Sequence, residues 1–372
     1  MKVVCLISSL QLGGAERQLC GLAAALKRGG ADVEILTYRD GDFYAGLPQL
    51  AGIPHVRITR RSDPGIIRAI AGHMKGADLL ISFMGGVNLK ACLARIFYPG
   101  FRLIVSERIT CTSCHLHDRL RFLLYRKAER VVCNNYSQEQ FIRAHAPGLA
   151  PRLVTIPNFV DTELFRPAPV RTSADPARII VTARLSRRKN PEGLVRAAAL
   201  LRSRGLEFRI TWLGLTERDG KYASRLRKLC SETGVESCVE FLPASTSVAE
   251  EYRSSDIFCL PSFYEGTSNS LAEALASGLP VACSRVGDNV RYVREAENGF
   301  LFDPRSPEEI ASALEKLISA DAARRAQMGV RSRHLAEELL GAQAFSRVYC
   351  RIASLSEDDF TVSSGTPSDT TL

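Results

Sequence analysis

Short apolar runs alternate with amphipathic stretches over the first 158 residues. The apolar runs have the length and residue types of buried strands, and they lie at 2–9, 32–38, 78–83, 102–107, 128–135 and 152–158. After the first run, a glycine turn opens a stretch with helical spacing that reaches about Lys27 and stops at Gly29 and Gly30. Strands that alternate with helices are typical of βαβ units, so the pattern predicts a doubly wound parallel sheet.

The alternation breaks at 157–170, where three prolines interrupt any period, and we interpret this segment as a linker. A second series follows, with strands near 178–184, 207–214, 239–243, 255–262 and 280–285, and helices near 191–203, 220–233 and 270–277. The sequence therefore predicts an α/β protein of two Rossmann-like domains, 1–160 and 161–340, facing across a cleft. In such sheets ligands bind at the carboxyl ends of the strands.

Length and composition agree with this division. A chain of 372 residues suggests two domains, and 45% hydrophobic with 24% charged residues indicates a soluble globular protein. Eleven scattered cysteines, several of them inside apolar runs, suit reduced thiols in a cytoplasmic protein. The N-terminal stretch is interpreted as a buried strand rather than a signal peptide, and no apolar run reaches about 18 residues. The last helical stretch covers about 323–354, and the polar residues 356–372 are predicted to be disordered.

The net charge of +9 is concentrated outside the acidic tail, because residues 356–372 contain no Lys or Arg. A basic body favours anionic partners such as nucleotide phosphates, nucleic acid or an acidic membrane surface. The alternative is that the charge serves solubility alone.

The stretch YEGTSNSLAEA at 264–274 combines two acids with the start of a predicted helix. Backbone N–H groups at a helix N-terminus are a favourable seat for a phosphate. Glu265 and Glu273 would then accept hydrogen bonds from hydroxyls of a sugar and of a ribose. The alternative makes Glu265 a helix-start acid and Glu273 a solvated charge. The backbone donors would come from Gly266, Thr267, Ser268, Asn269, Ser270 and Leu271.

Two cations follow the strand at 178–184. Arg184 and Lys189 would hold a diphosphate, the first as a bidentate partner and the second as a point charge. The alternative is a basic loop that only increases solubility. For Arg187 and Arg188 we assign no other role. A third element is Gly14, at a glycine turn of the first domain that lacks the full dinucleotide fingerprint.

Four blocks in this order resemble the family-4 retaining glycosyltransferases, which have the GT-B fold. They are GGAERQL at 13–19, IPNFVDTELFRP at 156–167, ARLSRRKNPEGL at 183–194, and the long block from Tyr264 to Val293. The resemblance covers nearly the whole chain. It also implies that a final helix, at 341–355, crosses back onto the first domain.

The resemblance implies a nucleotide-sugar donor, and we expect UDP as the nucleotide. Arg184 and Lys189 would bind its diphosphate, Glu265 the donor sugar and Glu273 the ribose, while Gly14 would approach from the first domain. The family transfers sugars with retention, and the leaving phosphate helps to take the acceptor proton. The resemblance implies neither a separate nucleophile nor a metal or other cofactor.

Glu107 and Arg108 end the strand at 102–107, where many relatives carry a histidine. This resembles a subset that acts on lipid-linked saccharides in bacterial surface glycan assembly. Glu107 would orient an acceptor hydroxyl and Arg108 an acceptor phosphate. The alternative is an ion pair at the strand end.

The segment 117–132 has basic residues around several apolar side chains. Such a segment could lie on an anionic membrane, where a lipid-linked acceptor is found, and we expect peripheral contact at the cytoplasmic face. The alternative is an ordinary helix packed on its own domain. No nucleic-acid partner is expected.

Two further motifs suggest metals. Asp40-Gly41-Asp42 fits a D-x-D pattern, but Asp-Gly after a strand is a common turn. A second cluster consists of Cys111, Cys114, His115 and His117. The sequence has no second pair of ligands at the spacing found in zinc fingers.

Two alternatives to a glycosyltransferase stay open. One is another enzyme class on the same fold: a sugar-nucleotide epimerase, which would not use Glu265 and Glu273 in this way, or a phosphorylase, which would need a much larger chain and a lysine for pyridoxal phosphate. The other is a non-catalytic nucleotide-sugar binder. Release of free nucleotide from a donor sugar would separate an enzyme from a binder.

Overall fold

The computed structural model describes residues 1–108, 111, 113–169, 176–245, 247–294 and 297–354. The chain divides into two compact units, and each is described by itself. The first comprises Met1–Cys133, Ile142–Ile156 and the described residues from Phe345 onward; the second comprises Asn134–Phe141 and Pro157–Ala344. The division at Ile156/Pro157 lies close to the predicted one at 160/161. The tail predicted to be disordered, 356–372, lies outside the described residues.

The first unit is built on a parallel sheet of seven strands in the order β3-β2-β1-β4-β5-β6-β7. Its central strands are almost completely buried, as expected for apolar runs covered on both faces. Sequence reasoning missed β3, a short edge strand without an apolar pattern. The strands are β1 Lys2–Leu6, β2 Asp32–Thr37, β3 His55–Arg57, β4 Leu79–Phe83, β5 Arg102–Glu107, β6 Arg130–Cys133 and β7 Leu153–Thr155.

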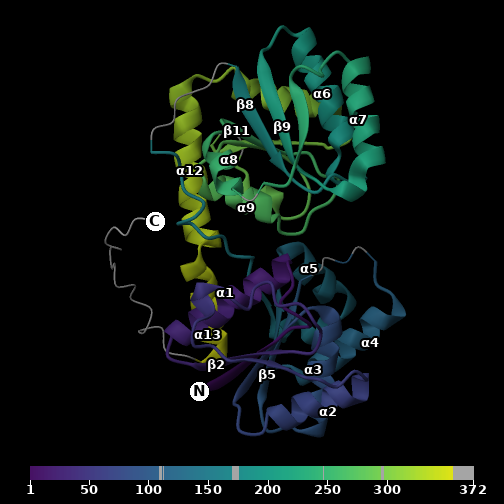
Figure 1. Cartoon of the computed structure of the whole chain (residues 1–372), viewed down its shortest axis with the longest axis vertical. Helices are drawn as coiled ribbons and strands as arrows, with labels where there is room; N and C mark the ends of the chain where they lie inside the picture. The colour runs from purple at the N-terminus through teal and green to yellow at the C-terminus, as the bar shows by residue number, and fades with distance from the viewer. Residues whose placement is uncertain (109–110, 112, 170–175, 246, 295–296, 355–372) are drawn as a thin grey trace. The chain divides into compact units, whose positions relative to one another are not determined.

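Helices cover this sheet. In Figure 1, α2 and α3 lie along one side of the first unit, and α1 and α13 lie along the other. The helices of the first unit are α1 Gly14–Arg28, α2 Asp63–His73, α3 Gly85–Phe97, α4 Leu116–Leu124 and α13 Ala342–Ala353, while α5 Tyr136–His145 contributes residues to both units.

The second unit has a parallel sheet of six strands in the order β10-β9-β8-β11-β12-β13. The sequence did not indicate β13, which is four residues long and only half-buried along its middle. The strands are β8 Ala177–Thr182, β9 Phe208–Leu215, β10 Val239–Pro243, β11 Ile257–Leu260, β12 Val281–Ser284 and β13 Gly299–Phe302. Two parallel-sheet units confirm the predicted fold class.

Two separate apolar cores cover the two faces of the second sheet. One contains Leu194 of α6 and Leu314 of α11, and the other contains Leu275 of α9 and Leu335 of α12. Figure 1 shows α6 and α7 on one side of the strands and α9 and α12 on the other. The helices are α6 Pro191–Ser203, α7 Gly220–Glu232, α8 Val248–Arg253, α9 Asn269–Ala276, α10 Asn289–Tyr292, α11 Pro307–Ile318 and α12 Ala322–Leu340.

The segment interpreted as a linker packs closely against the second unit. Val160 and Phe165 are both 2% exposed, and Phe165 makes an edge-to-face contact with Tyr252 at 5.9 Å between ring centroids. Arg333 of α12 donates to the carbonyl oxygens of Thr162 and Phe165 at 2.8 and 2.7 Å. The three prolines therefore prevent helix or strand formation in this segment, but the segment still packs against the core of the second unit.

The predicted C-terminal helical stretch is two helices, because Gly341 leaves the helical conformation at ψ 155°. Beyond it, α13 joins the first unit, which confirms the predicted return of the final helix. Arg102 of β5 donates to the last carbonyl groups of α13, those of Ala353 at 2.7 Å and Ile352 at 3.0 Å. None of the described helices is both long enough and apolar enough to cross a membrane.

Candidate active site

A hollow of about 330 Å³ lies in the second unit at the carboxyl ends of β8 and β11. The loops after these two strands, which are neighbours in the sheet, place side chains there, as expected for a parallel sheet. The structure brings together in this one hollow most of the residues that the sequence singled out, namely Arg184, Lys189, Glu265, Thr267, Ser268, Asn269, Ser270 and Glu273.

Lys189 and Glu265 form an ion pair at the hollow. Lys189 Nζ lies 2.5 Å from Glu265 Oε1, and the two side chains are only 14% and 7% exposed. The sequence assigned these residues to different parts of a ligand and did not predict that they touch. A cation and a carboxylate held this closely act as one polar unit toward any ligand.

The loop that carries Lys189 is fixed by Asn190. This residue has φ 59° and ψ 48°, in the left-handed region that Asn tolerates. Its side-chain nitrogen donates to the carbonyl oxygens of Pro261 at 3.1 Å and Pro304 at 2.7 Å, and its oxygen accepts from Gly193 N at 3.1 Å. Asn190 therefore caps α6 and also ties the basic loop to the loop after β11. The sequence reading missed this role.

Helix α9 begins at the hollow. Ser268 is its N-cap and accepts from Leu271 N at 3.4 Å. In the part of the chain that the structure describes, the backbone N–H groups of Asn269 and Ser270 have no hydrogen-bond acceptor. Of the backbone donors predicted for an anion, these two are available, whereas Leu271 N is engaged by the cap.

Glu273 lies one turn into α9 and is 8% exposed, so it is not a solvated surface charge. The hydroxyl of the buried Tyr252 lies 3.3 Å from Glu273 Oε2 and 3.2 Å from the carbonyl oxygen of Ser270. Tyr252 also hydrogen-bonds with Thr182 at the end of β8. This tyrosine orients the carboxylate. No sequence signal distinguishes it from a core aromatic residue.

The loop from Glu265 to Gly266 packs against Gly287. Gly287 has φ +51°, and a Cβ at this position would lie 2.1 Å from the carbonyl oxygen of Glu265. Only glycine allows so close an approach of two backbone segments. Gly287 therefore fixes the position of Glu265 from the loop after β12.

Gly14 begins α1 in the first unit and is not among the lining residues of this hollow. The Glu16 side chain folds back against the turn before it, because a Cβ on Gly13 would lie 2.1 Å from a carboxylate oxygen of Glu16. Glu16 is 6% exposed, and the sequence pattern assigned it no separate role. The approach of Gly14 to a diphosphate stays a prediction.

Glu107 and Arg108 lie in a buried region of the first unit. Glu107 accepts a hydrogen bond from the Tyr125 hydroxyl and lies 3.5 Å from Arg121 Nε. Burial raises the pKa of the Glu107 carboxyl, although the positive charge of Arg121 opposes this shift. Glu107 therefore does form an ion pair at the strand end, as the alternative reading has it. Its partner is Arg121 and not the adjacent Arg108.

Arg108 contacts the C-terminal helix. Its guanidinium stacks 3.9 Å from the ring centroid of Phe83 and donates to the Tyr349 hydroxyl at 2.9 Å. Tyr349 belongs to α13, so Arg108 helps to hold that helix on the first sheet. The acceptor roles of Glu107 and Arg108 stay predictions.

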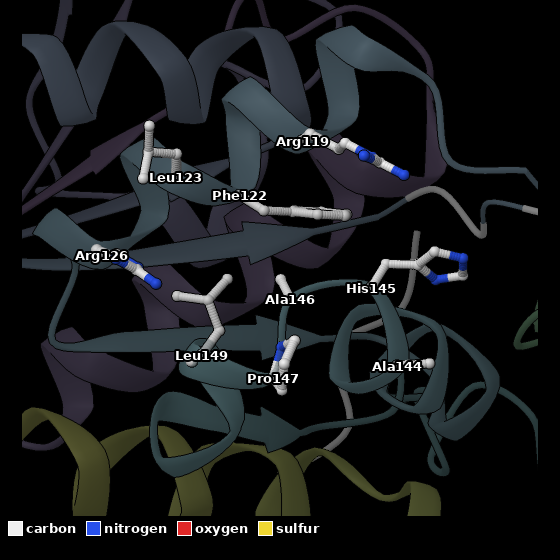
Figure 2. A pocket seen from close by; sticks show the side chains of 10 residues that line it. Arg119, Phe122, Leu123, Arg126, Ala144, His145, Ala146, Pro147 and Leu149 are labelled. Carbon is white, nitrogen blue, oxygen red and sulfur yellow. The ribbon is translucent and has the colours of Figure 1, made fainter.

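A separate hollow of about 490 Å³ in the first unit shares no residue with the candidate site. Figure 2 shows the aromatic ring of Phe122 between the guanidinium groups of Arg119 and Arg126, across from His145 and Leu149. Helix α4 contributes one wall and also exposes three leucines, Leu116 (74%), Leu120 (56%) and Leu123 (56%).

Side chains of the two suggested metal motifs make contacts with other protein side chains. Asp40 and Asp42 both pair with Arg57. The His115 and His117 rings stack at 5.7 Å between centroids. Within the described ranges, no group of three or more His, Cys, Asp or Glu side chains could hold a metal ion.

Comparison with known proteins assigns both halves of the chain to glycosyltransferases. Residues 12–164 match the model of Glycosyltransferase Family 4, and residues 166–335 match that of Glycosyl transferases group 1. The chain belongs to the family-4 glycosyltransferases. Its two parallel-sheet units are those of the GT-B fold.

Two curated relatives illustrate the similarity of this glycosyltransferase. The putative glycosyltransferase EpsF of Bacillus subtilis is 25% identical over 358 residues, which cover 87% of this chain and 88% of EpsF. A D-inositol 3-phosphate glycosyltransferase of Pseudarthrobacter chlorophenolicus is 34% identical over 214 residues, or 54% of this chain. The chain spans about half the length of that relative and of the enzymes with the same name from Paenarthrobacter aurescens, Rhodococcus jostii and an Arthrobacter strain.

Solved structures show the same fold. Anabaena HepE in complex with UDP superposes with a TM-score of 0.82 at 20% identity, covering 95% of this chain and 100% of HepE. A glycosyltransferase from Rickettsia africae superposes with a TM-score of 0.81 at 16% identity, covering 95% and 99%.

Proposed function

We propose that this glycosyltransferase moves a hexose, with retention at the anomeric carbon, from a UDP-sugar to a hydroxyl group of a saccharide acceptor. We further propose that the acceptor is lipid-linked and that the product belongs to a surface polysaccharide or glycan. The hollow at the carboxyl ends of β8 and β11 carries this proposal.

The hollow suits a nucleotide diphosphate at several points. Arg184 and Lys189 supply positive charge, and the N–H groups of Asn269 and Ser270 supply donors at the positive end of α9. Glu273, oriented by Tyr252, would accept from the two vicinal hydroxyls of a ribose. Glu265 would accept from hydroxyls of the donor sugar.

The choice of UDP rests on similarity. HepE, which shares the fold at 20% identity, has been solved with UDP and with UDP-glucose.

The proposed chemistry requires positioning and charge neutralisation. The bond between the anomeric carbon and the β-phosphate oxygen breaks while the acceptor oxygen bonds to the same face. The acceptor proton passes to a leaving phosphate oxygen. Two cations, Arg184 and Lys189, stabilise the charge that develops on the diphosphate, a task that a metal performs in other transferases. The proposed reaction therefore uses neither a protein nucleophile nor a metal.

We place the reaction at the cytoplasmic face of a membrane. The eleven cysteines are all free thiols, as in a reducing compartment. Helix α4 presents Leu116, Leu120 and Leu123 to solvent with Arg119 and Arg126 close by, a combination that binds anionic lipid surfaces.

The test is incubation of the purified full chain with separate UDP-sugars, followed by measurement of released UDP. Hydrolysis or transfer from at least one donor is expected, and NMR of the sugar product should show the anomeric configuration of the donor. UDP that binds without turnover of any donor would favour the non-catalytic binder. Inversion of configuration would contradict the retaining mechanism.

A further inference from the structure

A second polar hollow, of about 500 Å³, lies in the first unit at the carboxyl ends of β2 and β3. Neither the family assignment nor the proposed donor site uses it. Four of its lining residues are arginines, Arg39, Arg57, Arg60 and Arg61. A volume of this size accommodates a sugar residue with a charged substituent.

The carboxylates around this hollow already have cationic partners. Arg57 pairs with Asp42, and its Nη1 lies 3.1 Å from Asp40. Asp63 lies 3.1 Å from Lys90, which comes from the neighbouring helix α3. These three acids share two cationic partners, so one negative charge remains beside the hollow.

Three further arginines line the hollow, so positive charges exceed negative charges there by two. Arg39, Arg60 and Arg61 are exposed, and over the described ranges none of them forms a salt bridge with a carboxylate. The hydroxyl of Tyr38, which also lines the hollow, has no hydrogen-bond partner among those residues. Guanidinium groups with free donors around a hollow match the planar oxygens of a phosphate or a carboxylate.

The hollow lies at the carboxyl edge of the first sheet, where β1 leads to Gly14 and β5 ends at Glu107. The loop after β2 is held against the loop after β1 by two backbone hydrogen bonds, Leu10 N to Gly41 O at 2.7 Å and Tyr44 N to Leu10 O at 2.9 Å. The loop after β1 leads directly to Gly14. A ligand in the hollow would therefore lie at the same carboxyl edge of the sheet as Glu107, although β1 and β4 separate β2 from β5.

We propose that Arg39, Arg60 and Arg61 bind an anionic group, a phosphate or a carboxylate, on the acceptor saccharide. That the ligand is the acceptor saccharide rests on the proposed function. That the ligand carries a negative charge rests on the residues of the hollow itself. It assigns the acceptor to the class of acidic or phosphorylated saccharides.

Binding to the full chain, pre-saturated with UDP, tests this proposal by isothermal titration at low salt. The probes are glucose 6-phosphate, inorganic phosphate and glucose. The variant Arg39→Gln/Arg60→Gln is compared with Arg28→Gln/Arg68→Gln, which removes two exposed arginines elsewhere in the same unit. Glucose 6-phosphate and phosphate should bind the wild type and the control alike, and the first variant at least tenfold more weakly; glucose should not bind.

Equal binding of glucose 6-phosphate by both double variants would overturn the proposal, and so would failure of the wild type to bind it. A third arm uses phosphatidylglycerol vesicles. If the Arg39→Gln/Arg60→Gln variant loses only vesicle binding, the anion is a lipid headgroup and the acceptor assignment is wrong. UDP affinity should be unchanged in every variant. A wild type without affinity for UDP would refute the proposed donor site, while the phosphate titration would still report on this hollow.

Discussion

Lys189 Nζ and Glu265 Oε1 lie 2.5 Å apart at the hollow of the second unit, and both side chains are largely buried. A buried carboxylate beside a buried ammonium is stable because each offsets the cost of removing the other from water. The pair therefore has a structural role in addition to the roles we propose for it toward the donor. A double-mutant cycle separates the two.

Glu265→Ala and Lys189→Met should each reduce kcat by about 10²–10³-fold, because each removes a group positioned at the transferred sugar or its leaving diphosphate. Each should also lower the melting temperature, since an unpaired buried charge is left behind. The variant with both changes should recover much of the stability and none of the activity. The control is Glu236→Ala, an exposed acid of the same unit. A double variant with nearly wild-type kcat would show that the pair serves folding alone.

Arg184→Ala should weaken UDP binding by about tenfold or more, because it removes a charge-assisted contact with the diphosphate. Arg187→Ala removes an equal charge from the same loop, where the side chain is exposed and does not line the hollow. Titration calorimetry with UDP compares the two. Equal losses of affinity would mean that only the general positive charge of the loop matters.

Gly287→Ala should reduce kcat strongly although residue 287 has no proposed contact with substrate. An alanine Cβ would lie 2.1 Å from the carbonyl oxygen of Glu265, so the loop must move. Misplacement of a catalytic group by about 1 Å can cost roughly 10²-fold. Gly220→Ala, where an added Cβ meets nothing within 4 Å, is the control. Wild-type kinetics for Gly287→Ala would show that the Glu265 loop tolerates displacement.

The ion pair between Arg102 and Glu129 should contribute to stability in a pH-dependent way; the same arginine also contacts the end of α13. Hydrogen bonds from Arg102 lower the pKa of Glu129 in the folded state. The unfolded-state pKa of a Glu carboxyl is about 4.3. Because the folded-state pKa of Glu129 is lower, the ion pair stabilises the folded protein fully at pH values above the unfolded-state pKa. This stabilisation is lost as the pH falls through the folded-state pKa.

Glu129→Gln should therefore lower the melting temperature at pH 7, by an amount equivalent to about 1 kcal/mol or less for a partly exposed pair, and have no effect near pH 2.5. Glu207→Gln, which removes an exposed partner of Arg202, is the control. A loss of stability that is the same at both pH values would exclude this ion pair as its source.

Chelators should leave the transfer rate unchanged, because the proposed diphosphate contacts are Arg184, Lys189 and backbone N–H groups. The measurement is the initial rate with and without EDTA, after dialysis and readdition of Mg²⁺ or Mn²⁺. A strict requirement for either ion would contradict the proposed mechanism.

Much of the fold could be predicted because buried parallel strands are nearly continuous apolar runs, such as the one around β4. The gathering of Arg184, Lys189, Glu265 and Glu273 could also be predicted, since all four follow strands whose carboxyl ends share one edge. Short, partly exposed strands such as β3 and β13 carry no such pattern and were missed.

The residues that position the site were missed for a different reason. Asn190, Tyr252 and Gly287 act through contacts with residues far away in the sequence, and each resembles an ordinary capping, core or turn residue locally. The burial of Glu265 was missed for the same reason. Its position directly after a strand predicts an exposed loop residue and gives no sign of its ion pair with Lys189.

A crystal structure of the protein with UDP tests the central claim most directly. The account predicts the diphosphate within hydrogen-bonding distance of Arg184, Lys189 and the N–H groups of Asn269 and Ser270, with the ribose hydroxyls at Glu273. Density for UDP elsewhere on the protein, with this hollow unchanged, would contradict it.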